Sequence, residues 1–557
     1  MNLRASLLAI FVLSICSTCA QAQFDTIINL PENPITPNPS GFSSFSIGNR
    51  MGILSNTQLN IDVGGSIGDL FNAGDTSTEN SNIEVNILGG VIGRSFNANS
   101  GSTVNISGGG FWNFFNANSG STVNISGGTV GNAFDAFPSS TINISGGTVG
   151  DRFLAHGGST VNISGGTVGN EIDGFTNSRF NISGGEIGDN FSARSTINIS
   201  GGIVGDSFRV FTNSTVDISG GTVGNGFRAI GGTVNVSGGT VGNGFDASSG
   251  STVHISGGTV GNNLIADTTV NISGGTVGNG LTVLSDRTVN ISGGTVGSSF
   301  NADSGSTVNI TAGTVGISFG ANIGSTVNIS GGEIGNSFDA NTGSTVNISA
   351  GTIGRFFDAF SGSTVNISGG TIDQDFDANS GSTVNISEGT IGQGFEAFNG
   401  STVNISGGTI ESDFDANFGS TINISGGVIG QGFVASNGST INISGGIFGD
   451  NFDANNSSAV NIFGTEFFLN GLRIDDLLID QAFTILDRGE DIILSGLLTD
   501  GTLFDFNLDD SRLASDDFFA SSATVTVTRV AVPEPGCGLT LATMSVLLLV
   551  RRRRTLD

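Results

Sequence analysis

The chain has 557 residues, of which 91 are Gly, 41 are Phe and only 7 are Pro. Abundant Gly beside many Phe, Val and Ile predicts tightly turning β-structure and argues against disorder, because disordered segments lack such core-forming residues. Its 47 acidic and 18 basic residues give a formal net charge of −29. So negative a chain repels nucleic acid and anionic membrane surfaces, and we expect neither as a partner.

Residues 1–22 have the order of a secretory signal peptide. Arg4 is followed by the apolar run 5–15 and then by Ala20-Gln21-Ala22, which predicts cleavage by signal peptidase after Ala22. The apolar run is shorter than the ~20 residues that a membrane-spanning helix needs. A lipoprotein box ending at Cys16 is the other alternative, but the Ile before that Cys fits it poorly. We therefore expect an exported protein.

Residues 60–463 repeat one short phrase, typified by Ser-Thr-Val-Asn-Ile-Ser-Gly-Gly-Thr-Val-Gly at 121–131. The central position of the phrase recurs 22 times from Asn60 to Asn461. Of the 21 intervals between successive central positions, 17 are as long as the interval from position 105 to position 124. Within the phrase, alternation places Val123 and Ile125 on the inward face of a strand. A Gly pair then turns the chain into a second short strand, and a third segment adds an inward Phe and Ala. So strict a period predicts stacked identical units rather than a globule.

We therefore predict an all-β fold, a single-stranded parallel β-solenoid of about 22 coils of about 19 residues with a rise of ~4.8 Å per coil. Prolines at 31, 34, 37 and 39 mark residues 23–59 as an N-terminal cap segment. After Asn461 the period ends, and residues 464–530 are expected to form a small C-terminal β cap with strands at 483–486, 491–494, 503–506 and 523–528. The three Cys lie outside the repeats, so we expect no disulfide within them.

Residues 531–557 contain a Pro-Glu-Pro sequence, an apolar run at 538–550 and four consecutive Arg. This order resembles the PEP-CTERM sorting tail. The resemblance implies that Pro533, Glu534 and Pro535 form the signature and that Arg551, Arg552, Arg553 and Arg554 form the basic cluster. It also implies recognition by an exosortase-type membrane protease, transient inner-membrane anchoring, and extracellular polysaccharide as a companion. A plain C-terminal anchor is the alternative, because the Arg cluster holds that end in the cytoplasm.

The outward Thr-x-Asn-x-Ser row is the most regular surface that the sequence predicts. It is represented by Thr122, Asn124 and Ser126 in one repeat and by Thr364, Asn366 and Ser368 in another. One interpretation is an amide ladder in which the Asn side chains hold neighbouring coils together. The other is a strip that binds a repetitive ligand, either a polysaccharide or ice. The Asn-Ile-Ser triplets also match the N-glycosylation sequence, but their number follows from the repeat.

One position past the core Phe, five successive coils carry an acid, namely Asp339, Asp358, Asp377, Glu396 and Asp415. Carboxylates stacked at this spacing repel one another unless water or a cation lies between them. We expect a tolerant solvent face without a cofactor, since Arg209 and Arg228 occupy equivalent places. Calcium is the one alternative, because it prefers several oxygen ligands.

We expect no catalytic residues, because the repeats are uniform and have no long loops. His156 and His254 are isolated and lack the partners of a metal site. The sequence thus predicts a secreted, non-enzymatic structural or adhesin-like protein of the cell surface or extracellular matrix. The alternative is a carbohydrate- or ice-binding module that uses the Thr-x-Asn-x-Ser row.

Overall fold

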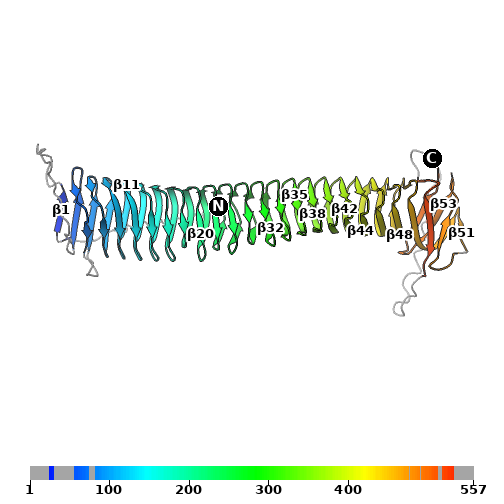
Figure 1. Ribbon diagram of the computed structural model, residues 1–557, viewed down its shortest axis with the longest axis horizontal. Coiled ribbons are helices and arrows are strands. Elements are labelled where there is room, and N and C mark those ends of the chain that lie inside the picture. Colours follow the sequence, from blue (N-terminus) through cyan, green and yellow to red (C-terminus); the bar gives the residue numbers. More distant parts are fainter. Residues whose placement is uncertain are drawn as a thin grey trace, which may run out of the picture. The chain divides into compact units, whose positions relative to one another are not determined.

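The computed structural model describes residues 24, 26–30, 56–74, 82–475, 477–489, 491–511 and 517–531. The chain divides into two compact units, Met1–Asn243 and Gly244–Asp557, and each is described by itself. The described residues are strands and turns without a helix. Each unit is a parallel β-solenoid, and about 20 turns lie roughly 19 residues apart, which confirms the predicted fold class (Figure 1). Each turn is called a rung below.

One rung consists of a long bent strand and a short strand. In the first unit, β11 (Thr122–Val130) pairs in parallel with β13 (Thr141–Val149), with Thr122 opposite Thr141. The sequence predicted two strands separated by a turn at the Gly pair. Some rungs have this arrangement, for example β23 (Thr233–Val236) and β24 (Thr240–Val241), whereas β11 is one strand that bends there with a register shift. Gly128 permits the bend, because its φ is +73° and a Cβ would lie 2.5 Å from the Gly108 carbonyl oxygen.

The strands of the first unit form a long-strand sheet and a short-strand sheet. The long-strand sheet contains β1 (Thr26–Leu30), β2 (Thr57–Ile61), β3 (Ser66–Ile67), β5 (Ile83–Ile87), β6 (Val91–Ile92), β8 (Ser102–Ile106), β9 (Gly110–Phe111), β11, β13, β15 (Thr160–Val168), β17 (Arg179–Ile187), β19 (Thr196–Val204), β21 (Thr215–Val223), β23 (Thr233–Val236) and β24 (Thr240–Val241). The short-strand sheet contains β4 (Asn72–Ala73), β7 (Phe96–Ala98), β10 (Asn113–Ala117), β12 (Asn132–Ala136), β14 (Phe153–Ala155), β16 (Asp173–Gly174), β18 (Ser192–Ala193), β20 (Arg209–Phe211) and β22 (Arg228–Ile230).

The second unit repeats this arrangement. Its long-strand sheet contains β26 (Thr252–Ile255), β27 (Thr259–Val260), β29 (Val270–Ile272), β30 (Thr276–Val277), β32 (Thr288–Val296), β34 (Thr307–Val315), β36 (Thr326–Ile334), β38 (Thr345–Ile353), β40 (Thr364–Ile372), β42 (Thr383–Ile391), β44 (Thr402–Ser412), β46 (Thr421–Gln431), β48 (Thr440–Phe448) and β50 (Ala459–Leu469). Its short-strand sheet contains β25 (Asp246–Ser248), β28 (Ile265–Ala266), β31 (Thr282–Val283), β33 (Asn301–Ala302), β35 (Phe319–Ala321), β37 (Phe338–Ala340), β39 (Phe357–Ala359), β41 (Phe376–Ala378), β43 (Phe395–Ala397), β45 (Phe414–Ala416), β47 (Val434–Ala435) and β49 (Asp453–Ala454).

The predicted inward side chains form the core of each unit. Val123, Ile125 and Phe134 are at most 1% exposed, and their counterparts on the other rungs are buried as well. The core Phe rings stack along the rungs, for example Phe338 on Phe357 with ring centroids 4.8 Å apart and planes 5° apart. Burial of aligned apolar side chains therefore joins each rung to its neighbours.

One rung of the first unit departs from this core and compensates locally. Ile172 stands in the Phe position and Gly174 in the Ala position. Phe180, which replaces the usual Val of the following long strand, fills the space that these smaller residues leave. A Cβ on Gly174 would lie 2.8 Å from the ring of Phe180, so Gly is required there.

The N-terminal segment adds one rung before Asn60. β1 pairs in parallel with β2, with Asn29 opposite Asn60. The Thr-Ile-Ile-Asn-Leu sequence of β1 matches the repeat phrase in its alternation, but the prolines that follow it led us to place it in the cap. Residues 31–55 of the predicted cap segment lie outside the described residues.

The C-terminal cap ends the parallel stack of the second unit with antiparallel strands. β56 (Thr524–Arg529) lies parallel to β50 as one more rung, and β52 (Ala482–Ile485) pairs with β56 in the antiparallel sense. β53 (Ile493–Leu498) pairs antiparallel with β50 and β54 (Leu503–Asn507), β51 (Leu472–Arg473) pairs antiparallel with β50, and β55 (Phe518–Phe519) pairs with β49. The Phe stack ends where Phe506 and Phe519 pack edge-on against Phe452.

Candidate functional site

The outward Thr-x-Asn-x-Ser row contains an amide ladder. The Nδ2 of Asn124 donates to the Oδ1 of Asn105 at 2.8 Å, and the Nδ2 of Asn366 donates to the Oδ1 of Asn347 at the same distance. Thr122 and Thr364 are half-buried beside the ladder, and Ser126 and Ser368 are exposed. The ladder therefore forms as the structural interpretation predicted, with each Asn bonded to its counterpart on the preceding rung.

Two rungs replace the ladder Asn and keep its contact with the following rung. The Nδ2 of Asn235 donates to a carboxylate oxygen of Asp217 at 2.7 Å, and the Nδ2 of Asn271 lies 3.3 Å from the Nδ1 of His254. Both replacements present an acceptor to the next rung. At the C-terminal end, the hydroxyl of Thr526 donates to the Oδ1 of Asn461. This position thus requires a side chain that can form a hydrogen bond with the next rung, and Asn is not the only residue that can do so.

The ladder leaves hydrogen-bonding capacity on the surface. An Asn amide has two N–H donors and two oxygen lone pairs, and the ladder uses one of each. At the N-terminal rungs this row borders a groove of about 430 Å³. The residues that line the groove are Asn29, Leu30, Asn60, Asp62, Asn86, Leu88, Asn105 and Ser107. Amides, one carboxylate and the half-exposed Leu88 therefore share one shallow site.

A second ladder, which the sequence analysis missed, lies at the corner before the short strand. The Oδ1 of Asn113 accepts the backbone N–H of Asn132 at 3.0 Å, and the Oδ1 of Asn132 accepts that of Asp151. In the second unit, the Oδ1 of Asn262 accepts the N–H of Asn279. The recurrence of Asn or Asp after Val-Gly was the feature of the sequence that could have revealed it.

The five acids of the predicted column face one another on successive short strands. Asp339 is opposite Asp358, Asp358 is opposite Asp377, and Glu396 is opposite both Asp377 and Asp415. All five side chains are half-buried. The amide of Asn417 donates to Glu396 at 3.2 Å. The acid column therefore exists as predicted in register, but it is more enclosed than the solvent face we expected.

Enclosure and mutual repulsion change the protonation of this column. Burial, followed by the like charges of Asp358 and Glu396, raises the pKa of Asp377 to about 7. Burial also raises the pKa of Asp339, Asp358 and Asp415. Among the described residues, no group of three or more His, Cys, Asp or Glu side chains is arranged to hold a metal ion. Calcium binding by the column stays the alternative that the sequence leaves open.

The outer face of the short-strand sheet in the first unit carries an aromatic column. His156 lies between the rings of Phe137 and Phe175, at centroid distances of 4.9 and 5.2 Å and with planes 9° apart in each case. Two rungs further along, the guanidinium of Arg194 lies 4.4 Å from the ring centre of Phe211. His156 is therefore part of a stack of rings, and it lies close enough to Asp135 for its charge to oppose the rise that burial causes in the pKa of that carboxyl group.

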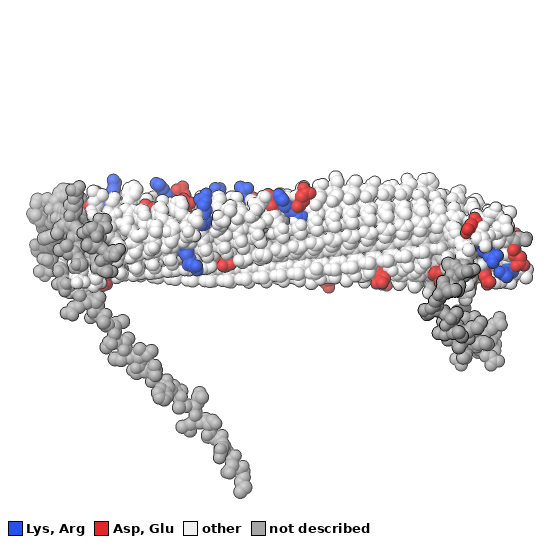
Figure 2. Space-filling view, turned by 90° about the horizontal axis from the view of Figure 1, so that it is seen from below, with Lys and Arg blue, Asp and Glu red and all other residues white. Residues whose placement is uncertain are grey.

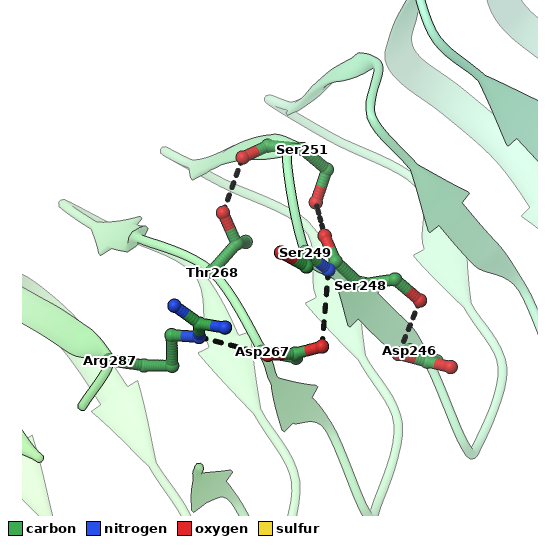
Figure 3. A network of polar contacts seen from close by, with 7 residues as sticks. All are labelled: Asp246, Ser248, Ser249, Ser251, Asp267, Thr268 and Arg287. Atoms are coloured by element: carbon green, nitrogen blue, oxygen red, sulfur yellow. Dashed lines mark hydrogen bonds and ion pairs between the residues drawn. The ribbon is translucent and has the colours of Figure 1, made fainter. Parts of the chain in front are cut away.

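Shortened rungs need extra polar contacts at the corner after the short strand, as Figure 3 shows. The interval from His254 to Asn271 is two positions shorter than the regular interval. Asp267 accepts the backbone N–H of Ser249 on the preceding rung at 3.2 Å and the Nε of Arg287 on the following rung at 2.9 Å. The hydroxyl of Thr268 donates to the Ser251 carbonyl oxygen. Together these contacts close a corner that lacks the usual turn.

In the face that Figure 2 shows, charged side chains are sparse over much of the repeats and gather mainly along one margin. The residues of the predicted sorting tail lie outside the described residues, as does the predicted signal peptide; the tail residues are Pro533, Glu534, Pro535, Arg551, Arg552, Arg553 and Arg554. Within the described part of the chain, no helix has the length and apolarity to cross a membrane.

Comparison of the chain with protein-family models, with curated proteins and with solved structures finds no match. The proposals below therefore depend on the residues and geometry given above.

Proposed function

We propose that the chain is a secreted, non-enzymatic structural or adhesin-like protein of the cell surface or extracellular matrix. The observation that carries this proposal is the use of the recurring polar side chains. The ladder Asn residues and the corner Asn and Asp residues bond mainly to the neighbouring rung. Such a surface is regular and self-supporting, which suits a scaffold better than a reaction site.

Export and sorting complete the proposal. The leader at residues 1–22 directs export by the general pathway, and signal peptidase removes it. The resemblance of residues 531–557 to the PEP-CTERM tail supports processing by an exosortase-type protease and association with exopolysaccharide.

The test compares cells that express the full chain with cells that express a chain lacking residues 533–557. We expect the full chain to lose its tail and to reach the surface or the medium by a route that the truncated chain does not follow. Replacement of Arg551–Arg554 by Ala is the second variant, and replacement of Thr555 and Leu556 by Ala is its matched control. An intact tail on the exported protein, or one distribution for all variants, contradicts the proposal.

A second candidate is a carbohydrate- or ice-binding module. The spare donor and acceptor on each ladder amide, repeated at ~4.8 Å, favour it, since a repetitive ligand meets the same pair on every rung. The N-terminal groove between the ladder, Asp62 and Leu88 adds a polar site with an apolar wall.

The two candidates are separated by replacing Asn347, Asn366 and Asn385 together with bulkier residues. Loss of binding to insoluble polysaccharide or ice with an unchanged circular dichroism spectrum supports the module. Absence of binding by the wild-type protein excludes it. Product release from a polysaccharide panel would contradict the non-enzymatic proposal.

A further inference from the structure

The short-strand sheets of the two units have outer faces of opposite charge over part of their length. In the first unit, Arg194, Arg209 and Arg228 are exposed on successive rungs beside Phe175 and Phe211, with Asp173 close to Arg194. Arg209 lies opposite Arg228 in the strand register, so two arginines occupy adjacent positions of the sheet. This arginine-aromatic face stands out in a chain with a net charge of −29.

In the second unit, the same strand position carries the acid column from Asp339 to Asp415. The next outward position carries the half-buried Phe360 and Phe398 on two of these rungs and Asn on the other three. Among the described residues, the salt bridges of this unit leave these five acids without an Arg partner. The acid-aromatic face therefore holds negative charge that its own unit does not neutralise.

We propose that the arginine-aromatic face of one copy binds the acid-aromatic face of a second copy. Both faces belong to strands with the same rise of ~4.8 Å per rung, so charges on successive rungs meet in step. Arg and aromatic residues are the types enriched at the centres of protein interfaces, and a guanidinium over an aromatic ring adds to the attraction.

The protonation of the acid column explains why association with a second copy is favourable. Burial raises the pKa of four of its carboxyl groups, and the like charge of a neighbouring acid adds to the rise at Asp339, Asp377 and Asp415. Arginines from a second copy would favour the charged form of these acids, and the association would offset the repulsion. The proposal goes beyond the surface role proposed above and does not depend on it.

The salt dependence of self-association is a first test of the proposed contact between the two faces. At low ionic strength the large negative charge of each copy opposes any approach, and at ~0.1 M salt this repulsion is screened beyond ~10 Å. Salt weakens the attraction between opposite charges in direct contact less than it weakens the repulsion between distant charges. We therefore expect association of the full chain at ~0.1 M salt and its loss at ~1 M.

The decisive test uses sedimentation velocity on the full chain and two charge-reversed variants. The first variant is Arg194→Asp with Arg209→Asp, and the second is Asp358→Arg with Asp377→Arg. Both changes fit the fold, because Arg209 and Asp358 hold equivalent positions on their rungs and Asp303 holds the position of Arg194. Each variant alone is expected to associate at least tenfold more weakly than the wild type, and an equimolar mixture of the two is expected to associate again.

The matched control is Glu186→Arg with Glu333→Arg, which makes the same change in net charge as the second variant but on the long-strand sheets. It is expected to associate like the wild type. The proposal is overturned if the wild type stays monomeric at ~0.1 M salt, if either reversed variant associates normally, or if the mixture fails to recover. Binding of an anionic polysaccharide to the arginine-aromatic face of a chain that stays monomeric would also overturn it.

Discussion

The rungs from Asn290 to Asn461 and those from Asn162 to Asn290 share one repeat pattern but differ in their corners, and three of the latter split the long strand into two shorter strands. In the former, every interval has the regular length and the core Phe rings stack without a break from Phe300 to Phe452. The latter contain all three shortened intervals, and Ile172, Leu264 and Leu281 replace core Phe. The regular rungs show what the coil requires, and the irregular rungs show what it tolerates.

The long strand and its ladder are the requirement. Where two residues are missing between His254 and Asn271, the ladder contact is still made, and the corner is closed by Asp267 and Arg287 instead. The position of the core Phe accepts other apolar side chains when volume is restored nearby, as Phe180 restores it next to Ile172. Five predictions test this division, from the largest expected effect to the smallest.

Removing a ring from the regular stack has the largest expected effect. Phe376→Ala should lower the free energy of unfolding by about 3–5 kcal/mol, because it removes a fully buried ring between two stacked neighbours. Urea denaturation measures this loss. The outward Phe360→Ala is the matched control and should cost far less, and equal losses would show that the stack is not the core.

The compensated rung can be broken by adding one methyl group. Gly174→Ala places a Cβ 2.8 Å from the Phe180 ring and 2.7 Å from the Ser195 hydroxyl, so it should cost about 1–3 kcal/mol. The second change Phe180→Val should recover part of that loss in thermal denaturation. If Phe180→Val adds its own loss in full, the two sites do not share space.

Breaking the ladder should have an effect of about 1 kcal/mol. Asn366→Leu leaves the Oδ1 of Asn347 and the Nδ2 of Asn385 without their partners. Asn366→Asp keeps the acceptor for Asn385, as Asp217 does for Asn235, and should cost less. The difference in urea midpoint between the two variants checks this order, and a reversed order would show that bulk rather than hydrogen bonding matters.

The corner ion pair should contribute least among the contacts. Arg287→Ala removes the 2.9 Å contact with Asp267, and a partly exposed pair of this kind is worth about 0.2–1 kcal/mol. Thermal denaturation at low and high salt measures it. The loss should shrink in ~1 M salt, where the Debye length is about 3 Å, and a salt-independent loss would point to packing of the Arg stem.

Protonation of the acid column gives a small effect of defined sign. The pKa of Asp377 is about 7 in the folded chain and near 3.8 when unperturbed, so between these values the folded chain binds the extra proton. Its contribution to stability is therefore largest at low pH, falls as the pH rises towards 7, and is constant above. Asp377→Asn should flatten the fall in melting temperature between pH 5 and pH 8, and an unchanged profile contradicts the assignment.

The sequence was sufficient for the parts of the molecule that repeat. The period predicted the solenoid, the alternation around Asn124 predicted the inward and outward faces, and the ladder followed from identical amides at one position. The cap strands beyond position 464 also lie close to the predicted segments. The solenoid, its faces and the ladder depend on a pattern that is the same in every repeat.

The remaining features depend on contacts between rungs, which no single repeat contains. The space filled by Phe180 is created by residues on the preceding rung, and the partners of Asp267 come from the rungs on both sides. The enclosure of the acid column likewise arises from neighbours one period away on each side. β1 was assigned to the cap because a long segment with four prolines separates its Leu30 from the next strand, which begins at Thr57.

The central claim is that side chains one period apart lie directly above one another. In a chain with its native Cys replaced by Ser, Thr364→Cys with Thr383→Cys places two thiols on paired residues, whereas Thr364→Cys with Thr402→Cys places them two rungs apart. A short thiol-bridging reagent such as dibromobimane should link the first pair, at ~4.8 Å, and leave the second pair, at about twice that distance, unlinked. Equal linking of both pairs, or no linking of the first, would contradict the stacked-rung structure.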